Sequence, residues 1–290
     1  MAAYRIFTDA TADLTDEFME GLPAVTVIPM QVEIAGREYT YGPGGDITPD
    51  EFYTLQKEGY FASTSQINPT VYFRHFEPCL QKGEDILYLC FSSGMSGTIQ
   101  SAKLCIEELR TEYPERKIFC VDTLCASLGE GFLVHEAARR QAEGYDLEEL
   151  LEWCIEHRLQ VCHWFTVDVF EHLRHGGRVS AASATAGSIL NIKPLLRVNE
   201  WGKLAVMEKP RGRRRAISAK MAHMEADWMP ALGNLVIVGH GDCPDGAGLL
   251  KQEIAERFPE ADIHVLDIGP IIGAHTGPGM LAVIYWGKNR

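Results

Sequence analysis

The sequence predicts an α/β protein of two domains, a prediction that depends on three observations. Short apolar runs typical of buried strands alternate with amphipathic helical patterns through the first half of the chain. Such alternation is characteristic of a parallel sheet covered by helices. From about residue 160 the pattern changes, and two strand-like runs joined by the turn "NEWG" indicate antiparallel pairing. The length of 290 residues also exceeds that of a usual single core.

We therefore expect an N-terminal domain over residues 1–160, in which helices cover both faces of a parallel sheet. A C-terminal α/β domain with a mixed, partly antiparallel sheet is expected over residues 161–290. The apolar runs at 4–8 and 24–29 predict the first two strands. The glycine-rich stretch that follows, residues 30–48, predicts a hairpin inserted into the first domain.

Caps and prolines mark the helix starts of the first domain. Thr48 and Pro49 supply an N-cap and a first-turn proline, and Asp146 with Glu149 forms a capping box. The almost continuous apolar run at 85–91 predicts a buried strand. The remaining predictions are helices from about 49, at 69–82, from about 98, at 126–143 and at 146–159, and a strand at 117–122.

The second domain is predicted from strand-like runs and one helix. "QVCHWFTV" is typical of a strand, whereas residues 175–194 are rich in small side chains. "LLRVNEWGKLAVMEK" predicts two antiparallel strands with the turn at "NEWG". "NLVIVGHGD" and "ADIHVLDIG" predict strands on either side of a helix at 245–258, and "MLAVIYWG" predicts a last strand.

Composition excludes several classes of function. A formal charge of -13 at pH 7 argues against nucleic acid as the main partner, because phosphate binding requires a basic face. The eight cysteines have no C-x-x-C spacing, which predicts structural thiols and no metal site. No apolar run has the length of a membrane span, and the opening residues lack a signal-peptide pattern. We expect a cytoplasmic protein without stable membrane insertion.

Polar residues follow several predicted strands of the first domain. Asp9, Thr64, the segment 92–96 and Asp122 each lie just past a strand end. In α/β sheets, ligands bind beyond the carboxyl ends of parallel strands. These side chains are therefore expected to share one rim.

Ser96, in "FSSGMSGTIQSA", has three interpretations. As a nucleophile it would need a G-x-S-x-G elbow, but Thr98 replaces the last glycine. In favour of a nucleophile, the order Ser96, Asp242, His275 matches the Ser, acid, His order of α/β-hydrolases. As an anion clamp it would act with the amides of Gly97 and Thr98 at a helix N-terminus. The third interpretation is a plain N-cap serine.

Three further segments carry basic residues that suit an anion or an acidic partner. His275 lies in "IGPIIGAHTGPG", where glycines and prolines predict an unusual backbone path before a strand, which favours a ligand role for the histidine. Arg178 follows two glycines in "LRHGGRVS", which suits a guanidinium close to an anion. "KPRGRRR" places five cations in an acidic protein, either as a solvated helix start or as a docking patch for an acidic partner.

Seven segments together carry a family resemblance. "STSQINPT", "CFSSGMSGTIQSA", "VDTLCASLGEG", "LRHGGRVS", "LNIKPLL", "KPRGR" and "GAHTGPG", with the start "TDATADL", resemble the DegV family of bacterial fatty-acid-binding proteins. The resemblance covers residues 8–279. It implies a two-domain α/β protein that buries a long-chain fatty acid between its domains. It also implies that a separate ATP-dependent fatty-acid kinase is the partner that converts the carboxylate to an acyl phosphate.

The resemblance assigns roles to individual residues. Thr64 and Ser96 match the hydroxyls that hold the carboxylate, and Arg178 and His275 match the basic residues at the head group. The charged pair expected to dock the kinase comprises Arg211 and Arg213.

Two positions depart from the family pattern, because Ala10 replaces a serine and Ile67 replaces a proline. The first departure weakens a role for Asp9, and the second could alter the tunnel mouth. The resemblance implies a lipid-binding protein without catalysis or cofactor. The alternative from a different class is a serine hydrolase or acyltransferase that uses Ser96 and His275.

Overall fold

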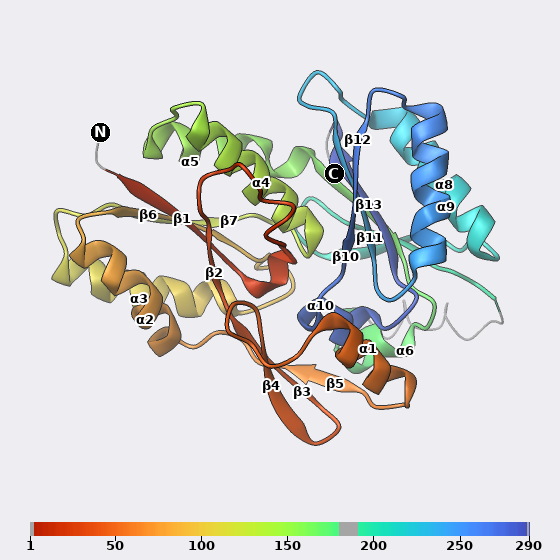
Figure 1. The fold of residues 1–290 in the computed structure, drawn as a ribbon, viewed down its shortest axis with the longest axis horizontal. Helices are drawn as coiled ribbons and strands as arrows, with labels where there is room; N and C mark the ends of the chain where they lie inside the picture. Colours follow the sequence, from red (N-terminus) through yellow and green to blue (C-terminus); the bar gives the residue numbers. More distant parts are fainter. Residues whose placement is uncertain (1–2, 180–190, 289) are drawn as a thin grey trace.

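The structure, a computed structural model, describes residues 3–179, 191–288 and 290. The chain folds into three sheets (Figure 1). The strand orders are β2-β1-β6-β7, β10-β9-β8-β13-β11-β12 and β4-β3-β5. The mixed α/β class predicted from the sequence is confirmed. Residues 180–190 of the stretch rich in small side chains lie outside the described residues.

The first sheet is parallel throughout, as predicted. Each of its strand pairs runs in the same direction, with Phe7 of β1 opposite Thr26 of β2 and Tyr88 of β6. Helices α2 and α3 contact one another and β6 and β7, while α4 and α5 cover the other face (Figure 1). The elements are β1 (Tyr4–Asp9), β2 (Thr26–Ile28), β6 (Asp85–Cys90), β7 (Ile118–Asp122), α2 (Pro69–Gln81), α3 (Thr98–Glu112), α4 (Leu128–Ala142), α5 (Leu147–His157) and the 3-10 turns η1 (Ala10–Ala12) and η2 (Arg158–Gln160).

The predicted hairpin insertion is present and is larger than expected. β3 (Met30–Ile34) and β4 (Arg37–Tyr41) form the hairpin, and β5 (Ala62–Thr64) adds a third antiparallel strand. Between them lies α1 (Pro49–Lys57), whose predicted N-terminus is confirmed by a complete capping box at Thr48. The sequence placed a strand end near Thr64 but gave no bounds for β5, because three residues are too few to show an alternating pattern. The pairing with β3 holds Thr64 at the end of this small sheet.

The second sheet is mixed, as predicted. Only the pair β11–β12 is parallel among its strand pairs in the described residues, and the turn "NEWG" joins the antiparallel strands β9 and β10. Its elements are β8 (Val161–Thr166), β9 (Leu195–Val198), β10 (Leu204–Glu208), β11 (Leu235–His240), β12 (Asp262–Asp267), β13 (Leu281–Trp286), α6 (Glu171–His175), α8 (Arg213–Asp227), α9 (Pro244–Arg257) and α10 (Pro270–Thr276).

α10 corrects one expectation. The segment around His275 was predicted to follow an unusual backbone path, but it forms a short helix that begins at Pro270 and has its C-cap at Gly277. Proline suits the first turn of a helix, because its missing amide proton would be unpaired there. Gly277 has a φ of 71°, which favours glycine and ends the helix.

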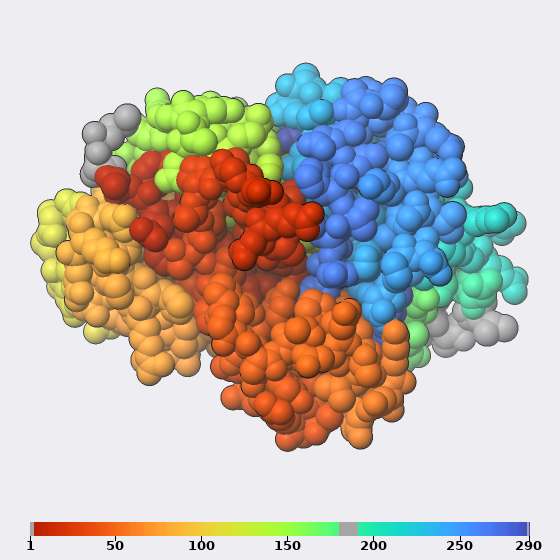
Figure 2. Space-filling model, in the orientation of Figure 1, coloured from red at the N-terminus to blue at the C-terminus, as the bar shows by residue number. Residues whose placement is uncertain are grey.

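Helix α4 joins the two halves of the chain. It contacts β6 of the first sheet and β8, β11 and β13 of the second. Its buried residues Leu128, Phe132 and Leu133 belong to one hydrophobic cluster that draws on both sheets. In the space-filling view, the blue C-terminal half abuts the red and orange N-terminal segments on the face shown (Figure 2). The two sheets therefore share a core, and the chain passes from one to the other at η2, next to the predicted boundary.

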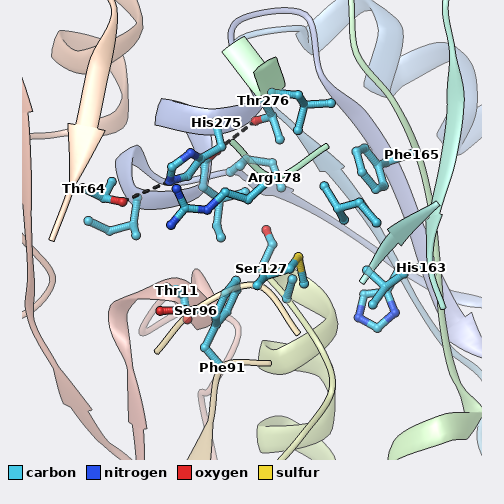
Figure 3. A pocket seen from close by; sticks show the side chains of 18 of the residues that line it. Thr11, Thr64, Phe91, Ser96, Ser127, His163, Phe165, Arg178, His275 and Thr276 are labelled. Carbon is cyan, nitrogen blue, oxygen red and sulfur yellow. Dashed lines mark hydrogen bonds between the residues drawn. The ribbon is translucent and has the colours of Figure 1, made fainter. Parts of the chain in front are cut away.

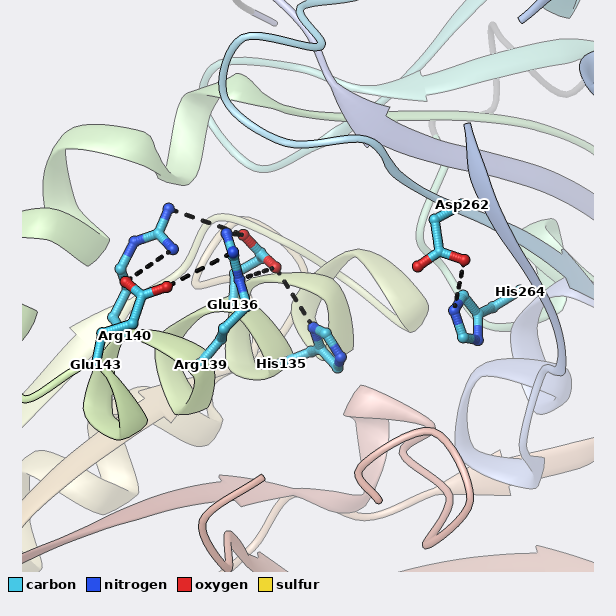
Figure 4. A network of polar contacts seen from close by, with 7 residues as sticks. All are labelled: His135, Glu136, Arg139, Arg140, Glu143, Asp262 and His264. Atoms are coloured by element: carbon cyan, nitrogen blue, oxygen red, sulfur yellow. Dashed lines mark hydrogen bonds and ion pairs between the residues drawn. The ribbon is translucent and has the colours of Figure 1, made fainter. Parts of the chain in front are cut away.

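The outer face of α4 carries an ion cluster around Glu136 (Figure 4). Its carboxylate accepts hydrogen bonds of 3.1 Å and 2.9 Å from Arg139 and lies 3.5 Å from His135 Nδ1. Burial raises the pKa of Glu136, but the neighbouring His135 and the hydrogen bonds from Arg139 outweigh it and leave that pKa below its ordinary value. Arg140, on the same helix, stacks over Trp153 of α5 at 4.9 Å. The contact between Arg140 and Trp153 joins α4 to α5.

All eight cysteines are free thiols, and most are buried. Across residues 3–179, 191–288 and 290, no helix has both the length and the apolar character needed to cross a bilayer. The same described residues contain no group of three or more His, Cys, Asp or Glu side chains placed to hold a metal ion.

Candidate functional site

A cavity of about 310 Å³ lies between the two halves of the chain (Figure 3). This volume falls within the range of pockets that bind small molecules. Its walls come from β5, the loop before α3, the start of α4, the strands β8 and β13, and α10. Most of the lining side chains are apolar, and a group of polar ones gathers at one end. Thr64, Arg178 and His275 lie together at that end, and Ser96 and Gly97 line the cavity from the loop before α3 (Figure 3).

Five of the six predicted ligand-binding residues thus line one cavity, although they come from distant parts of the sequence. The rim predicted from the strand ends is only partly present, because Asp9 and Asp122 do not line the cavity. Asp122 instead accepts 3.1 Å hydrogen bonds from the amides of Ser93 and Leu124, which shapes the loop after β6. Asp9 is fully buried beneath the cavity.

Thr64 and His275 contact one another at the polar end. Thr64 Oγ1 lies 3.0 Å from His275 Nε2, and His275 Nδ1 has no hydrogen-bond partner in the described part of the chain. Burial lowers the pKa of His275 to about 3, and the positive charge of Arg178 adds to the effect. The imidazole is therefore neutral at physiological pH, and it contributes one N–H donor and one acceptor.

The two glycines before Arg178 have a physical role that the sequence only suggested. A Cβ atom on Gly176 would lie 2.1 Å from His275 Nδ1, so only glycine lets this turn approach the imidazole. Gly177 follows with a φ of 69°, which turns the chain. The segment after α6 therefore brings Arg178 next to His275, as labelled in Figure 3.

Arg178 has a positive charge that no protein carboxylate neutralises. Its guanidinium donates to the backbone carbonyl of Gly176 and forms no ion pair with any described residue. The neighbouring residues 180–190 contain no Asp or Glu. Burial lowers the pKa of Arg178 from its ordinary value, which shows that the cation is partly removed from water. A half-buried cation without a counterion favours the binding of an anion here.

Ser96 is placed at the start of α3, where it was expected. Its Oγ accepts a 3.2 Å hydrogen bond from the Thr98 amide and lies 2.9 Å from Thr98 Oγ1. Because the Thr98 amide is used in this way, and Thr98 itself does not line the cavity, Thr98 is not available to a ligand as predicted. Gly97 does line it, and a Cβ there would lie 2.6 Å from Gln66 Oε1. The positive end of the α3 dipole therefore faces the cavity at Ser96 and Gly97.

The geometry of a serine hydrolase is not formed in the described residues. His275 hydrogen-bonds Thr64 and not Ser96, whose side-chain partner is Thr98. Asp242, the acid in the expected order, forms an ion pair with Lys57 instead. A catalytic serine needs a general base that is oriented by a third group.

The expected docking residues differ from one another. Arg211 is exposed. Arg213, in contrast, donates 2.8 Å to Asp168 Oδ1 and 2.9 Å to the carbonyl of Gly279, three residues past the end of α10. An internal ion pair therefore holds the Arg213 guanidinium, and the docking role of both arginines stays a prediction. The departures Ala10 and Ile67 are both buried, and neither residue is among those that line the cavity.

Sequence reasoning missed a group of buried carboxyls under the cavity floor. Thr11 and Ser127 line the cavity and hydrogen-bond the carboxyls of Glu130 and Asp13, at 2.8 Å and 2.6 Å. The signal lay in "LGEGF", because a Cβ on Gly131 would lie 2.3 Å from the carbonyl of Ala12. Gly131, next to the buried Glu130, marks the close approach of α4 to η1.

The hydrogen bonds of this group determine where one proton lies. Thr11 Oγ1 contacts both Asp9 and Glu130, and a hydroxyl has only one proton to donate, so one of the two carboxyls must be protonated. Asp9 also accepts from the Thr11 amide and, at 2.7 Å, from Tyr88. Burial raises the pKa of both carboxyls; that of Glu130 lies well above its ordinary value, and the charge of Asp9 raises it further. Glu130 is therefore the neutral donor of the pair.

Comparison with known proteins agrees with the fold. The sequence profile described as "Uncharacterised protein, DegV family" matches residues 3–288. A DegV domain-containing protein of Clostridium perfringens is 37% identical over 290 residues, which cover 100% of this chain and 99% of the relative.

Two solved structures are also similar over their whole length. A DegV family protein from Thermus thermophilus, described by its fatty acid binding, has 30% identity and a TM-score of 0.86, and the match covers 99% of this chain and 100% of the other. DegV of Bacillus subtilis, described as a fatty acid binding protein, has 26% identity and a TM-score of 0.84, with the same coverage. By sequence and by structure, this chain belongs to the DegV family.

Proposed function

We propose that this protein binds a long-chain fatty acid in the cavity and presents its carboxylate to a separate ATP-dependent fatty-acid kinase. The observation that carries the proposal is Arg178, a half-buried cation without a protein counterion at the polar end of a mostly apolar cavity. A fatty acid matches this arrangement, because it combines one anionic group with a long apolar chain. The relatives from Thermus thermophilus and Bacillus subtilis support the same ligand class.

The head group would be held by a small set of donors. Arg178 supplies the charge, and charge-assisted hydrogen bonds to a carboxylate are about twice as strong as neutral ones. If His275 donates its Nε2 proton to Thr64, then the Thr64 hydroxyl keeps its own proton for the carboxylate. Ser96 and the Gly97 amide lie at the positive end of α3 and add a favourable field.

The chain of the acid supplies most of the affinity. Each buried methylene contributes about 0.8 kcal/mol, so ten to fifteen of them contribute roughly 8 to 12 kcal/mol. That gain offsets the loss of translational and conformational freedom, which costs about 4 kcal/mol or more. Apolar side chains from β8, β13 and α10 provide the matching walls.

Presentation to a kinase requires that the head group be reachable. Ser65 and Gln66 line the polar end of the cavity and are exposed, so this end reaches the protein surface. Ser96 has no general base among the residues that the structure describes, which supports a role in holding the carboxylate and not in attacking an ester. The exposed Arg211 remains the candidate contact for the kinase.

Mass spectrometry of the protein purified from cells tests the binding function. We expect a fatty acid that organic solvent releases without chemical cleavage. An acyl ester on Ser96 would instead support the hydrolase or acyltransferase. Failure of the stripped protein to bind any fatty acid would exclude the proposed function. Formation of acyl phosphate from the bound acid by an added fatty-acid kinase and ATP tests presentation separately.

A further inference from the structure

A second polar group lies in the cavity, away from the polar end. His163, on β8, is 5% exposed, and neither of its ring nitrogens has a hydrogen-bond partner in the part of the chain that the structure describes. Figure 3 shows it across the cavity from Thr64 and His275. Its neighbours in the wall are apolar, among them Phe165 on the same strand and Ile284, its partner on β13. An unpaired imidazole in an apolar wall requires an explanation.

The fold makes room for this imidazole. Gly129, in the first turn of α4, faces the ring, and a Cβ atom there would lie 1.7 Å from His163 Nε2. Any larger residue at Gly129 would displace the ring. A histidine with two unpaired nitrogens is costly to bury, because each polar group loses its hydrogen bonds to water.

The ring is neutral, so it can both donate and accept. Burial lowers the pKa of His163 well below its ordinary value, and the charge of Arg290 lowers it further, while the Val161 backbone has a smaller opposite effect. A neutral imidazole has one N–H donor and one nitrogen acceptor.

Apart from the head-group residues Thr64 and Ser96, three residues of the cavity wall have hydroxyls that are already engaged inside the protein. Ser127 donates to Asp13 at 2.6 Å, Thr11 contacts Glu130 at 2.8 Å, and Thr276 donates to the carbonyl of Ile272 at 3.1 Å. They therefore offer little hydrogen-bonding capacity to a ligand. His163 differs from them in that its whole capacity is unused.

We propose that the preferred ligand of this protein carries a hydroxyl group on its acyl chain, and that His163 hydrogen-bonds this hydroxyl. The inference rests on the proposed function, because the carboxylate must occupy the Arg178 end for the chain to reach His163. A hydroxyl is the group that suits a neutral imidazole in either tautomer, since it both donates and accepts. An unsubstituted chain would cover the ring and leave both nitrogens unpaired.

A water molecule is the competing partner. A small cavity of about 10 Å³, lined by His163, Arg197, Asp227 and Arg290, lies beside the ring. That volume is close to the minimum for one water molecule. A water there can bond one ring nitrogen, but the second nitrogen would still need a partner, which the ligand hydroxyl supplies.

Displacement of a fluorescent fatty acid from the solvent-stripped protein provides the test. The competitors are octadecanoic acid and its 10-hydroxy and 12-hydroxy derivatives. We expect at least one hydroxy acid to bind about five- to tenfold more tightly than octadecanoic acid, the effect of one buried hydrogen bond. His163→Leu should abolish this preference. His163→Gln, of similar volume but polar, should keep part of it.

Phe165→Leu is the matched control, because it alters the same wall without changing its polarity. It should change the affinities of the plain and hydroxylated acids by the same factor. Thermal melting establishes that each variant is folded. Equal affinity of all three acids for the wild type, or a preference that survives in His163→Leu, would overturn the inference while leaving fatty-acid binding intact. Failure of octadecanoic acid itself to displace the probe would instead contradict the proposed function.

Discussion

Thr64 Oγ1 lies 3.0 Å from His275 Nε2, a contact between residues 211 positions apart. It joins β5 of the inserted sheet to α10 of the C-terminal half. Tyr53 reinforces the same junction, because its hydroxyl donates 2.9 Å to the carbonyl of Ile268 just before α10. The insertion and the second half therefore build the polar end of the cavity together, and neither half holds the head-group residues alone.

Replacing Thr64 tests this polar end. Thr64→Val keeps the shape of the side chain and removes the hydroxyl that we assign to the carboxylate. We expect fatty-acid affinity to fall by about 1 to 3 kcal/mol, the usual cost of removing a hydrogen bond to a charged group. Thr64→Ser retains the hydroxyl and should bind nearly as well as the wild type. Direct titration of both variants with the same fatty acid measures the difference, and equal affinity in Thr64→Val would remove Thr64 from the head-group site.

Asp13 should make stability depend on pH. Its carboxyl accepts from Ser127 and, at 3.0 Å, from the Gly269 amide, and burial raises its pKa to about 8. In the unfolded chain the group titrates near its ordinary value of about 3.9. Between these two pKa values the folded state binds more protons than the unfolded state. The stabilising effect of the protonated form is therefore complete below about pH 4 and is lost as the pH rises to 8.

Asp13→Asn removes this titration while keeping the shape and one acceptor. We expect the free energy of unfolding of the wild type to fall between about pH 5 and pH 8 more steeply than that of Asp13→Asn, by up to about 1.4 kcal/mol per pH unit. Urea unfolding of the ligand-free proteins at several pH values gives both slopes. If the free energy of unfolding falls equally steeply with pH in the wild type and in Asp13→Asn, then Asp13 is ionised in the folded protein.

The proton assigned to Glu130 gives a third prediction. If Glu130 is a neutral donor, then Glu130→Gln keeps a donor in the same place and should cost less than about 1 kcal/mol of unfolding free energy. Glu130→Ala leaves a cavity and unpaired threonine hydroxyls, and should cost roughly 3 kcal/mol or more. Asp9→Asn is the matched comparison, because Asp9 accepts from Thr11 and Tyr88 and has no need of a donor. If Glu130→Gln has a lower free energy of unfolding than Asp9→Asn, then the proton belongs to Asp9 and not to Glu130.

Local signals were predictable from the sequence, whereas contacts over long distances were not. The N-cap at Thr48 and the capping box at Asp146 are confirmed because a cap depends on residues within one turn. The contact of Glu130 with Thr11 joins positions 119 apart, and no periodic pattern reveals such a neighbour. The short helix α10 was missed because glycine and proline usually interrupt helices, yet here they begin and end one.

The candidate site shows the same division between local signals, which were predictable, and contacts between distant residues, which were not. The helix start after Ser96 was predicted from its own residues, but the meeting of Thr64, Arg178 and His275 followed only from the family resemblance. His163 carried no signal in the sequence, because a histidine in an apolar strand is as typical of a core as of a binding site. Its unpaired nitrogens and the facing Gly129 become visible only when β8 and α4 are packed together.

The last prediction separates the roles of Arg211 and Arg213. Arg213 bonds Asp168 and the carbonyl of Gly279, and so holds the N-terminus of α8 against the turn that follows α10. Arg213→Ala should therefore lower the melting temperature and weaken fatty-acid binding, because this turn follows directly from the helix that carries His275. Arg211 is exposed and should affect neither property.

Arg211→Ala is expected to slow acyl-phosphate formation by an added fatty-acid kinase, and the difference from the wild type should shrink at high salt. Exposed charges act mainly on association, and they are screened over about 8 Å at physiological ionic strength. Kinase rates at two salt concentrations, measured beside fatty-acid affinity, test the two arginines separately. A wild-type rate in Arg211→Ala would exclude it from kinase docking. Unchanged stability and binding in Arg213→Ala would return that residue to the docking surface, because its internal contacts would then be dispensable.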